Sequence, residues 1–217
     1  MSSHALLSTI RDLRAIAVIR TATADQAVAA GAACVRGGIR LLEITLTIDG
    51  ALDAVERLRA EPGALVGVGS VIAPAQVRAA AGRGAVFAVS PHFDADILAE
   101  TKARGLLSGM GGVTPTEAMA CHRAGVDVVK VFPASSFGGP AHVKALLEPL
   151  PFLRLMPTGG VDLTNIRAYL DAGALGFGLG GSLLDRKAIA AGDWDRIEST
   201  ARSIVGIVDA WRAEQAA

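Results

Sequence analysis

The chain has 217 residues, 51% of them hydrophobic and 19% charged, a length typical of one α/β domain with a substantial core. Its 21 basic and 21 acidic residues give a formal net charge of zero, which offers no electrostatic basis for binding nucleic acid or an anionic membrane. Cys34 and Cys121 lack the spacing of a disulfide framework or a metal site, and we find no signal peptide or membrane span, so we expect a cytoplasmic protein.

Eight short apolar segments recur along the chain, separated by roughly 20 to 25 residues, about the length of one strand plus a crossover helix. In chain order they are residues 15–20, 41–45, 65–69, 86–90, 106–110, 128–132, 153–157 and 177–181. Each is continuously apolar rather than alternating, which is typical of parallel strands covered on both faces.

The intervening segments carry helix start and stop signals. Thr23 to Gln26 and Thr114 to Glu117 each form a capping-box pattern. We expect first-turn prolines at Pro74 and Pro115, and left-handed glycines that end helices at Gly37, Gly84, Gly105, Gly125 and Gly173. Two more helices are predicted near residues 3–14 and 193–213.

Eight strand–helix units favour a closed (β/α)₈ TIM barrel with an extra N-terminal helix over an open doubly wound sheet. No linker or low-complexity tract interrupts the pattern. The sequence therefore predicts one barrel domain over residues 1–217. In such barrels the active site lies at the C-terminal ends of the strands. The polar residues at these positions are Arg20, Glu43, Thr45, Thr47, Ser70, Ser90, Lys130, Thr158 and Ser182.

Lys130 is one of only four lysines and lies inside the apolar segment 126–133. Burial disfavours an ammonium ion, and a neutral amine can attack a carbonyl group to form an imine. A lysine that merely pairs with a carboxylate explains the strand equally well. Glu43 has two similar interpretations, as the counter-ion of Lys130 or Arg20, or as a proton shuttle. Both interpretations place Glu43 near Lys130.

Two glycine turns follow the seventh and eighth predicted strands. They contain Gly159 with Gly160, and Gly180 with Gly181 and Ser182. Barrels often bind phosphate in these two loops, although glycine also serves tight turns. Arg20 at the end of the first strand either balances Glu43 or binds an anionic substrate, and its position favours the second role.

Six motifs in fixed order carry a family resemblance. They are Leu-Glu43-Ile-Thr-Leu, Val-Gly-Val-Gly-Ser70-Val, Ser90-Pro91, Val-Val-Lys130-Val-Phe132-Pro-Ala, Met-Pro-Thr158-Gly159-Gly160-Val and Gly-Gly181-Ser182. Together, from about Ala17 to Leu184, they resemble the class I 2-keto-3-deoxy-6-phosphogluconate (KDPG) and 4-hydroxy-2-oxoglutarate (KHG) aldolases.

The resemblance implies reversible aldol cleavage of a 2-keto-4-hydroxy acid into pyruvate and an aldehyde, which is glyceraldehyde 3-phosphate for KDPG and glyoxylate for KHG. Lys130 matches the imine-forming lysine and Glu43 the general acid/base. The expected substrate contacts are Arg20, Thr47, Ser70, Pro91, Phe132 and Thr158, and the expected phosphate contacts are Gly159, Gly160, Gly180, Gly181 and Ser182. Members are commonly homotrimers and need no metal or organic cofactor.

The chain departs from the family pattern at two positions. Thr47 stands where many relatives have an arginine that holds the substrate carboxylate, and Ser70 stands where threonine is common. Arg20, Ser70 or backbone amides would then have to bind the substrate carboxylate in place of that arginine. Residues 132–138 also resemble 2-keto-3-deoxy-6-phosphogalactonate aldolases. A phosphate-binding isomerase without a covalent intermediate and a non-catalytic barrel are the competing interpretations.

Overall fold

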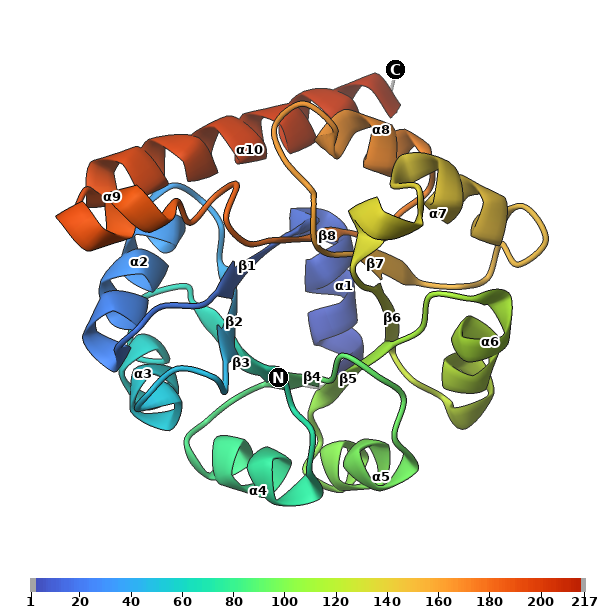
Figure 1. Ribbon diagram of the computed structural model, residues 1–217, viewed down its shortest axis with the longest axis horizontal. Helices are drawn as coiled ribbons and strands as arrows, with labels where there is room; N and C mark the ends of the chain where they lie inside the picture. Colours follow the sequence, from blue (N-terminus) through green and yellow to red (C-terminus); the bar gives the residue numbers. More distant parts are fainter. Residues whose placement is uncertain (1–2, 216–217) are drawn as a thin grey trace.

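A computed structural model describes residues 3–215, which form a ring of parallel strands surrounded by helices (Figure 1). The strands are β1 (Ala15–Ile19), β2 (Leu41–Thr45), β3 (Leu65–Gly69), β4 (Phe87–Val89), β5 (Leu107–Gly111), β6 (Val128–Val131), β7 (Leu155–Pro157) and β8 (Phe177–Leu179). They pair in the order β7-β6-β5-β4-β3-β2-β1-β8, and an isolated parallel bridge between Thr158 and Gly178 joins the two ends. The predicted (β/α)₈ barrel is confirmed.

Helices cover the outside of the ring and one of its ends. They are α1 (Ser3–Leu13), α2 (Ala24–Arg36), α3 (Ala51–Leu58), α4 (Pro74–Gly82), α5 (Ala95–Ala103), α6 (Pro115–Ala124), η1 (Ala134–Phe137, a 3₁₀ turn), α7 (Pro140–Leu147), α8 (Ile166–Asp171), α9 (Arg186–Ala191) and α10 (Trp194–Gln215). The two additional helices predicted from sequence are α1 and α10. Among the described residues, no helix is long and apolar enough to span a bilayer.

The capping box of α6 forms as predicted, with the Glu117 carboxylate accepting from the Thr114 amide at 2.8 Å. At α2 the prediction is half right. The Thr23 hydroxyl accepts from the Gln26 amide, but the Gln26 side chain accepts from the Ala22 amide rather than from Thr23. Thr23 lies in an isolated bridge with Asp49.

Gly37 does not take the predicted left-handed conformation, whereas the other four predicted glycines have positive φ. Its φ is −79°, and the next residue, Gly38, has φ 96°. Gly37 serves close packing instead, because a Cβ there would lie 2.5 Å from the Cβ of Ala201 in α10. Only a glycine lets α2 end against that helix.

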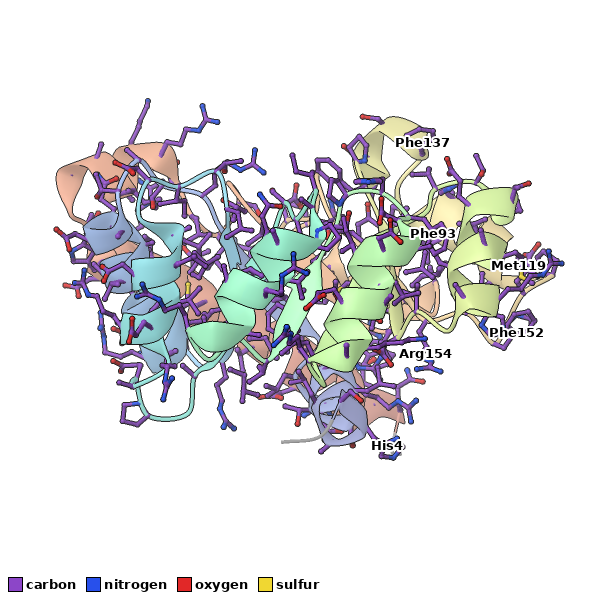
Figure 2. The ribbon with its side chains drawn as sticks, turned by 90° about the horizontal axis from the view of Figure 1, so that it is seen from below. His4, Phe93, Met119, Phe137, Phe152 and Arg154 are labelled. Carbon is purple, nitrogen blue, oxygen red and sulfur yellow. The ribbon has the colours of Figure 1, made fainter. Side chains whose placement is uncertain are left out.

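The helix α1 closes the N-terminal end of the barrel. Its buried side chains Leu6 and Ile10 join an apolar cluster with strand residues that include Leu41, Phe87 and Val128. Figure 2 shows His4 of α1 at one end of the molecule, with Phe93 and Phe137, which follow β4 and β6, toward the other end. The C-terminal ends of the strands are thus the end that α1 leaves open.

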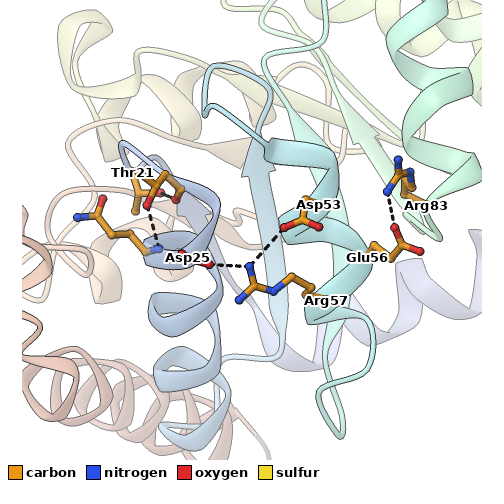
Figure 3. A network of polar contacts seen from close by, with 8 residues as sticks. Thr21, Asp25, Asp53, Glu56, Arg57 and Arg83 are labelled. Atoms are coloured by element: carbon orange, nitrogen blue, oxygen red, sulfur yellow. Dashed lines mark hydrogen bonds and ion pairs between the residues drawn. The ribbon is translucent and has the colours of Figure 1, made fainter.

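Ion pairs connect neighbouring helices on the outer surface (Figure 3). Arg57 of α3 contacts Asp25 of α2 at 2.7 Å and Asp53 of its own helix at 3.3 Å, and Arg83 at the end of α4 pairs with Glu56 of α3. Exposed pairs of this kind contribute only about 0.2 to 1 kcal/mol each. The positions of these helices therefore depend mainly on their buried apolar faces.

Candidate active site

The side chains of Glu43 in β2 and Lys130 in β6 both point into the barrel. Successive strand residues alternate between the interior and the helix layer, so a residue two positions away shares the same side. Leu41 and Val128, each two residues earlier, belong to the apolar cluster that fills the lower barrel. Glu43 and Lys130 therefore lie one layer nearer the open end, directly above that cluster.

These two side chains form a buried ion pair. The Lys130 Nζ lies 3.0 Å from the Glu43 Oε1, with side chains 7% and 1% exposed. The second carboxylate oxygen, Oε2, is buried and has no hydrogen-bond partner among the described residues. The ring of Phe132 lies 5.7 Å from Nζ. Two charged groups removed from water need close pairing, and the predicted proximity of Glu43 and Lys130 is confirmed.

Gly69 at the end of β3 provides the space for this carboxylate. A Cβ at Gly69 would lie 2.0 Å from the Glu43 Oε1, far inside contact distance. Lower in the barrel Gly67 does the same for Phe87, whose ring would lie 2.3 Å from an added Cβ. The glycines of β3 therefore allow large side chains from neighbouring strands to fill the interior.

Thr158 lies just beyond β7, where β7 and β8 meet. Its amide donates to the Val131 carbonyl at 2.9 Å, and Thr158 forms an isolated parallel β-bridge with Gly178. The Thr158 Oγ1 is buried and lacks a hydrogen-bond partner within the described chain. A Cβ at Gly178 would lie 2.4 Å from this oxygen, so glycine is needed there too. An unpaired buried hydroxyl is costly, and it is available to a ligand.

A cavity of about 430 Å³ opens at this end of the barrel. Its lining comprises Val18, Arg20, Phe132, Thr158 to Asp162, Gly180 to Ser182, Leu184 and Arg186. It thus brings together eight of the predicted site residues, including Arg20. Lys130 and Glu43 do not line it. Phe132 connects the two regions, because it lines the cavity and lies beside the Lys130 ammonium.

The two predicted glycine turns contact each other. The Ser182 hydroxyl donates to the Val161 carbonyl at 2.6 Å, which ties the turn after β8 to the turn after β7. The amides of Leu183 and Leu184 both donate to the Gly180 carbonyl, forming a short helical turn. The amides at the start of such a turn point away from its hydrogen-bonded end, an arrangement suited to an anion.

Arg20 reaches toward the end of β3. Its Nη2 lies 3.4 Å from the Ser70 Oγ, and Ser70 has a φ of 59°, which is unusual for a residue other than glycine. Backbone strain of this kind is often found at functional sites. Ser70 itself is outside the 430 Å³ cavity, although Arg20 lines it. Arg20 therefore lies between the cavity and Ser70.

Thr47 and Pro91 are also outside this cavity. The Thr47 hydroxyl lies 3.0 Å from the Thr45 hydroxyl, which donates to the Ile19 carbonyl at 3.0 Å. Thr47 therefore donates to Thr45 in a short chain of hydrogen bonds. Pro91 lines a separate cavity of about 250 Å³ with His92 and other residues.

Two charged residues of the cavity were absent from the sequence prediction, Arg186 and Asp162. Arg186 follows the predicted phosphate loop by four residues, and this spacing was the available signal. Hydrogen bonds from the hydroxyl and amide of Thr164 hold the pKa of Asp162 below its ordinary value, so it carries a negative charge at neutral pH. Within residues 3–215, no group of three or more His, Cys, Asp or Glu side chains is arranged to bind a metal.

The geometry supports amine chemistry at Lys130. A carboxylate in direct contact can accept a proton from the ammonium and leave a neutral amine, which is a nucleophile toward carbonyl carbon. The same carboxylate can then return the proton to an oxygen or carbon nearby. The cavity that Phe132 joins to this pair provides room for a small acid.

Comparisons with known proteins agree with this chemistry. A family model described as KDPG and KHG aldolase matches residues 6–200. The KHG/KDPG aldolase of Escherichia coli K12 is 36% identical over 88% of this chain and 90% of its own length. The solved KDPG aldolase of Legionella pneumophila, captured with pyruvate as a covalent carbinolamine, superposes with a TM-score of 0.85 at 28% identity over 94% of this chain and 98% of that one. A solved structure described as native KDPGal superposes with a TM-score of 0.84 at 30% identity, over 93% of this chain and 97% of that one.

Replacing Glu43 with leucine should destabilise the protein, because it leaves the Lys130 ammonium buried without its partner. We expect a loss of about 3 to 5 kcal/mol in the free energy of unfolding. The double variant Glu43→Leu/Lys130→Met removes both charges and should regain most of that loss. Urea unfolding at one fixed pH measures all three proteins. A double variant no more stable than the single one would contradict the buried-pair interpretation.

Proposed function

The chain belongs to the KDPG and KHG aldolase family, and from that premise we propose that it cleaves a 2-keto-4-hydroxy acid into pyruvate and an aldehyde through an imine on Lys130. The observation that carries the proposal is the buried contact between Lys130 and Glu43. It supplies an amine and a base at hydrogen-bond distance in a region that water reaches poorly. Both are needed for imine formation at neutral pH.

The cycle begins when the neutral Nζ of Lys130 attacks the C2 carbonyl carbon of the substrate. The carbinolamine loses its hydroxyl group as water, with a proton supplied by Glu43, and leaves a protonated imine. Glu43 next accepts the proton of the C4 hydroxyl group. The C3–C4 bond breaks, its electron pair enters the imine, and the C4 oxygen leaves as the aldehyde carbonyl.

The remaining enamine is converted to pyruvate by the same two residues. Glu43 returns its proton to C3, which restores the imine. Water then adds to C2 and displaces the Lys130 amine. The protonated imine lowers the barrier because it accepts the electron pair that a ketone alone would leave as a carbanion.

The remaining site residues would bind the two ends of the substrate. The contact between Arg20 and Ser70 supports a role for this pair in holding the C1 carboxylate. Thr47, which is exposed on the loop after β2, would offer its hydroxyl group to the substrate as well. Thr158 would offer its unpaired buried hydroxyl, and Phe132 and Pro91 would offer apolar surface. The glycine turns 159–160 and 180–181, with Ser182, would bind a terminal phosphate.

We take KDPG as the principal substrate, and its cleavage yields pyruvate and glyceraldehyde 3-phosphate. KHG would be a second substrate, and its cleavage yields pyruvate and glyoxylate. The size of the cavity and its glycine turns favour a substrate longer than KHG. The alternative substrate is 2-keto-3-deoxy-6-phosphogalactonate, because residues 132–138 resemble the enzymes that act on it and a solved KDPGal protein is 30% identical to this chain. No metal or organic cofactor takes part in the proposed cycle.

We further propose that residues 1–217 act as one cytoplasmic domain and that three copies assemble as a homotrimer, as the family resemblance implies. Light scattering behind a sizing column should give three times the chain mass of 22.2 kDa. A mass of one or two chains at working concentration would refute the trimer.

Borohydride reduction in the presence of pyruvate should attach a reduced pyruvyl group to Lys130, because reduction makes the imine irreversible. Peptide mass spectrometry locates the adduct. Lys130→Met should abolish both the adduct and pyruvate release, whereas Lys144→Met, which removes an exposed lysine of α7, should retain both. An unmodified Lys130 in the active wild-type protein would favour the isomerase interpretation instead.

Gly69→Ala should inactivate the enzyme without unfolding it. The added Cβ would overlap the Glu43 Oε1 and push the carboxylate away from Lys130. A displacement of about 1 Å at a reacting group can cost roughly 100-fold in rate, and we expect at least that loss in kcat/KM. Gly82→Ala is the matched control, because a Cβ there meets nothing within 4 Å. Activity of Gly69→Ala within a few-fold of wild type would show that Glu43 need not remain in contact with Lys130.

A further inference from the structure

Arg186 is the first residue of α9, and its side chain lines the cavity together with the turn Gly180 to Ser182. Its backbone position is fixed, since the Asp185 carboxylate caps the helix by accepting from the Ala188 amide at 2.9 Å. Across residues 3–215 no acidic side chain forms an ion pair with Arg186. Its guanidinium is therefore available to an anion in the cavity.

Arg20 is the other cation of this cavity, but it is partly engaged elsewhere. Its Nη2 contacts the Ser70 hydroxyl at the end of β3. The strand order places β2 between β1 and β3, so this guanidinium reaches away from β8 and its glycine turn. Arg186 comes from the segment after that turn, at the start of α9, and in the part of the chain that the structure describes no side-chain hydrogen bond draws its guanidinium toward β3. The two arginines come from different elements and both also line a smaller cavity of about 330 Å³, but only Arg20 is bonded to Ser70.

Asp162 adds a negative charge near the glycine turns. Asp162 lines the same cavity, and its Oδ1 accepts from the Thr164 amide at 2.8 Å and from the Thr164 hydroxyl at 2.6 Å. These bonds anchor it at the turn after β7. This negative charge would repel a phosphate bound at the turns, and a nearby cation lowers that repulsion. The guanidinium of Arg186 can offset it.

We propose that Arg186 is a specificity-determining residue that binds the terminal phosphate of the substrate with its guanidinium, beside Ser182 and the two glycine turns. A guanidinium is suited to this role because its planar donors match two phosphate oxygens at once. Arg20 with Ser70 would serve the carboxylate at the other end. This inference rests on the proposed aldolase function and assigns a charged partner to its distal group.

The test compares cleavage of KDPG and of its unphosphorylated analogue, 2-keto-3-deoxygluconate, by wild type and Arg186→Gln. A hydrogen bond to a charged group contributes about 1.5 to 3 kcal/mol, so kcat/KM for KDPG should fall about 10- to 100-fold. The value for the unphosphorylated acid should change less than about twofold, the range expected of a distant surface substitution. Arg186→Lys should recover part of the loss. Inorganic phosphate should inhibit the wild type competitively and the Arg186→Gln variant more weakly.

Lys187→Gln is the control, because it removes the same charge from the next residue of α9, which is exposed and does not line the cavity. It should leave the ratio of the two substrates unchanged. Borohydride trapping with pyruvate separates the two proposals, since pyruvate carries no phosphate. Absence of trapping in the wild type refutes the proposed function. Normal trapping with equal losses on both substrates, or with no loss in Arg186→Gln, refutes the role of Arg186 alone.

Discussion

The contact between Lys130 and Glu43 is the interaction on which the rest of the site depends. Two opposite charges lie 3.0 Å apart in a barrel whose interior is otherwise filled by apolar side chains. Neither charge would be tolerated there alone, because the low dielectric of the interior makes an unpaired ion costly. The pair is stable and yet reactive, since proton transfer from Lys130 to Glu43 produces a neutral amine and a neutral acid. Both are the forms that imine formation requires.

The surrounding strands are adapted to that pair. Gly69 leaves room for the carboxylate, and Gly178 leaves room for Thr158. One carboxylate oxygen and the Thr158 hydroxyl remain without partners among the described residues, although both are buried. Buried polar atoms are usually satisfied, so these two unsatisfied atoms lower the stability of the protein and are free to bond a ligand. At the opposite end the barrel is filled by apolar side chains, because α1 closes it by packing Leu6 and Ile10 into the apolar cluster. Stability and chemistry therefore occupy opposite ends of one barrel.

Charge at the open end is divided between separate elements. Arg20 comes from β1 and contacts Ser70 after β3, whereas Arg186 comes from α9 and lies beside the turn after β8. Both arginines line the same cavity, so the open end offers two cations to an anionic substrate. In the proposed function, Arg20 would bind the carboxylate and Arg186 the distal phosphate.

The sequence by itself determined the eight strands, the closed barrel and the reacting residue types, because these follow from local patterns: apolar runs, helix caps and isolated charges in strands. It also indicated the two glycine turns. Whether Glu43 and Lys130 face the interior or the helices was open, since a shift of one residue reverses every side chain of a strand. Only the tertiary structure decided it, by the layer that Leu41 and Val128 fill below them. The same holds for Gly69, because its importance depends on Glu43 of a neighbouring strand meeting it in space, and such a contact between separate strands leaves no local pattern in the chain.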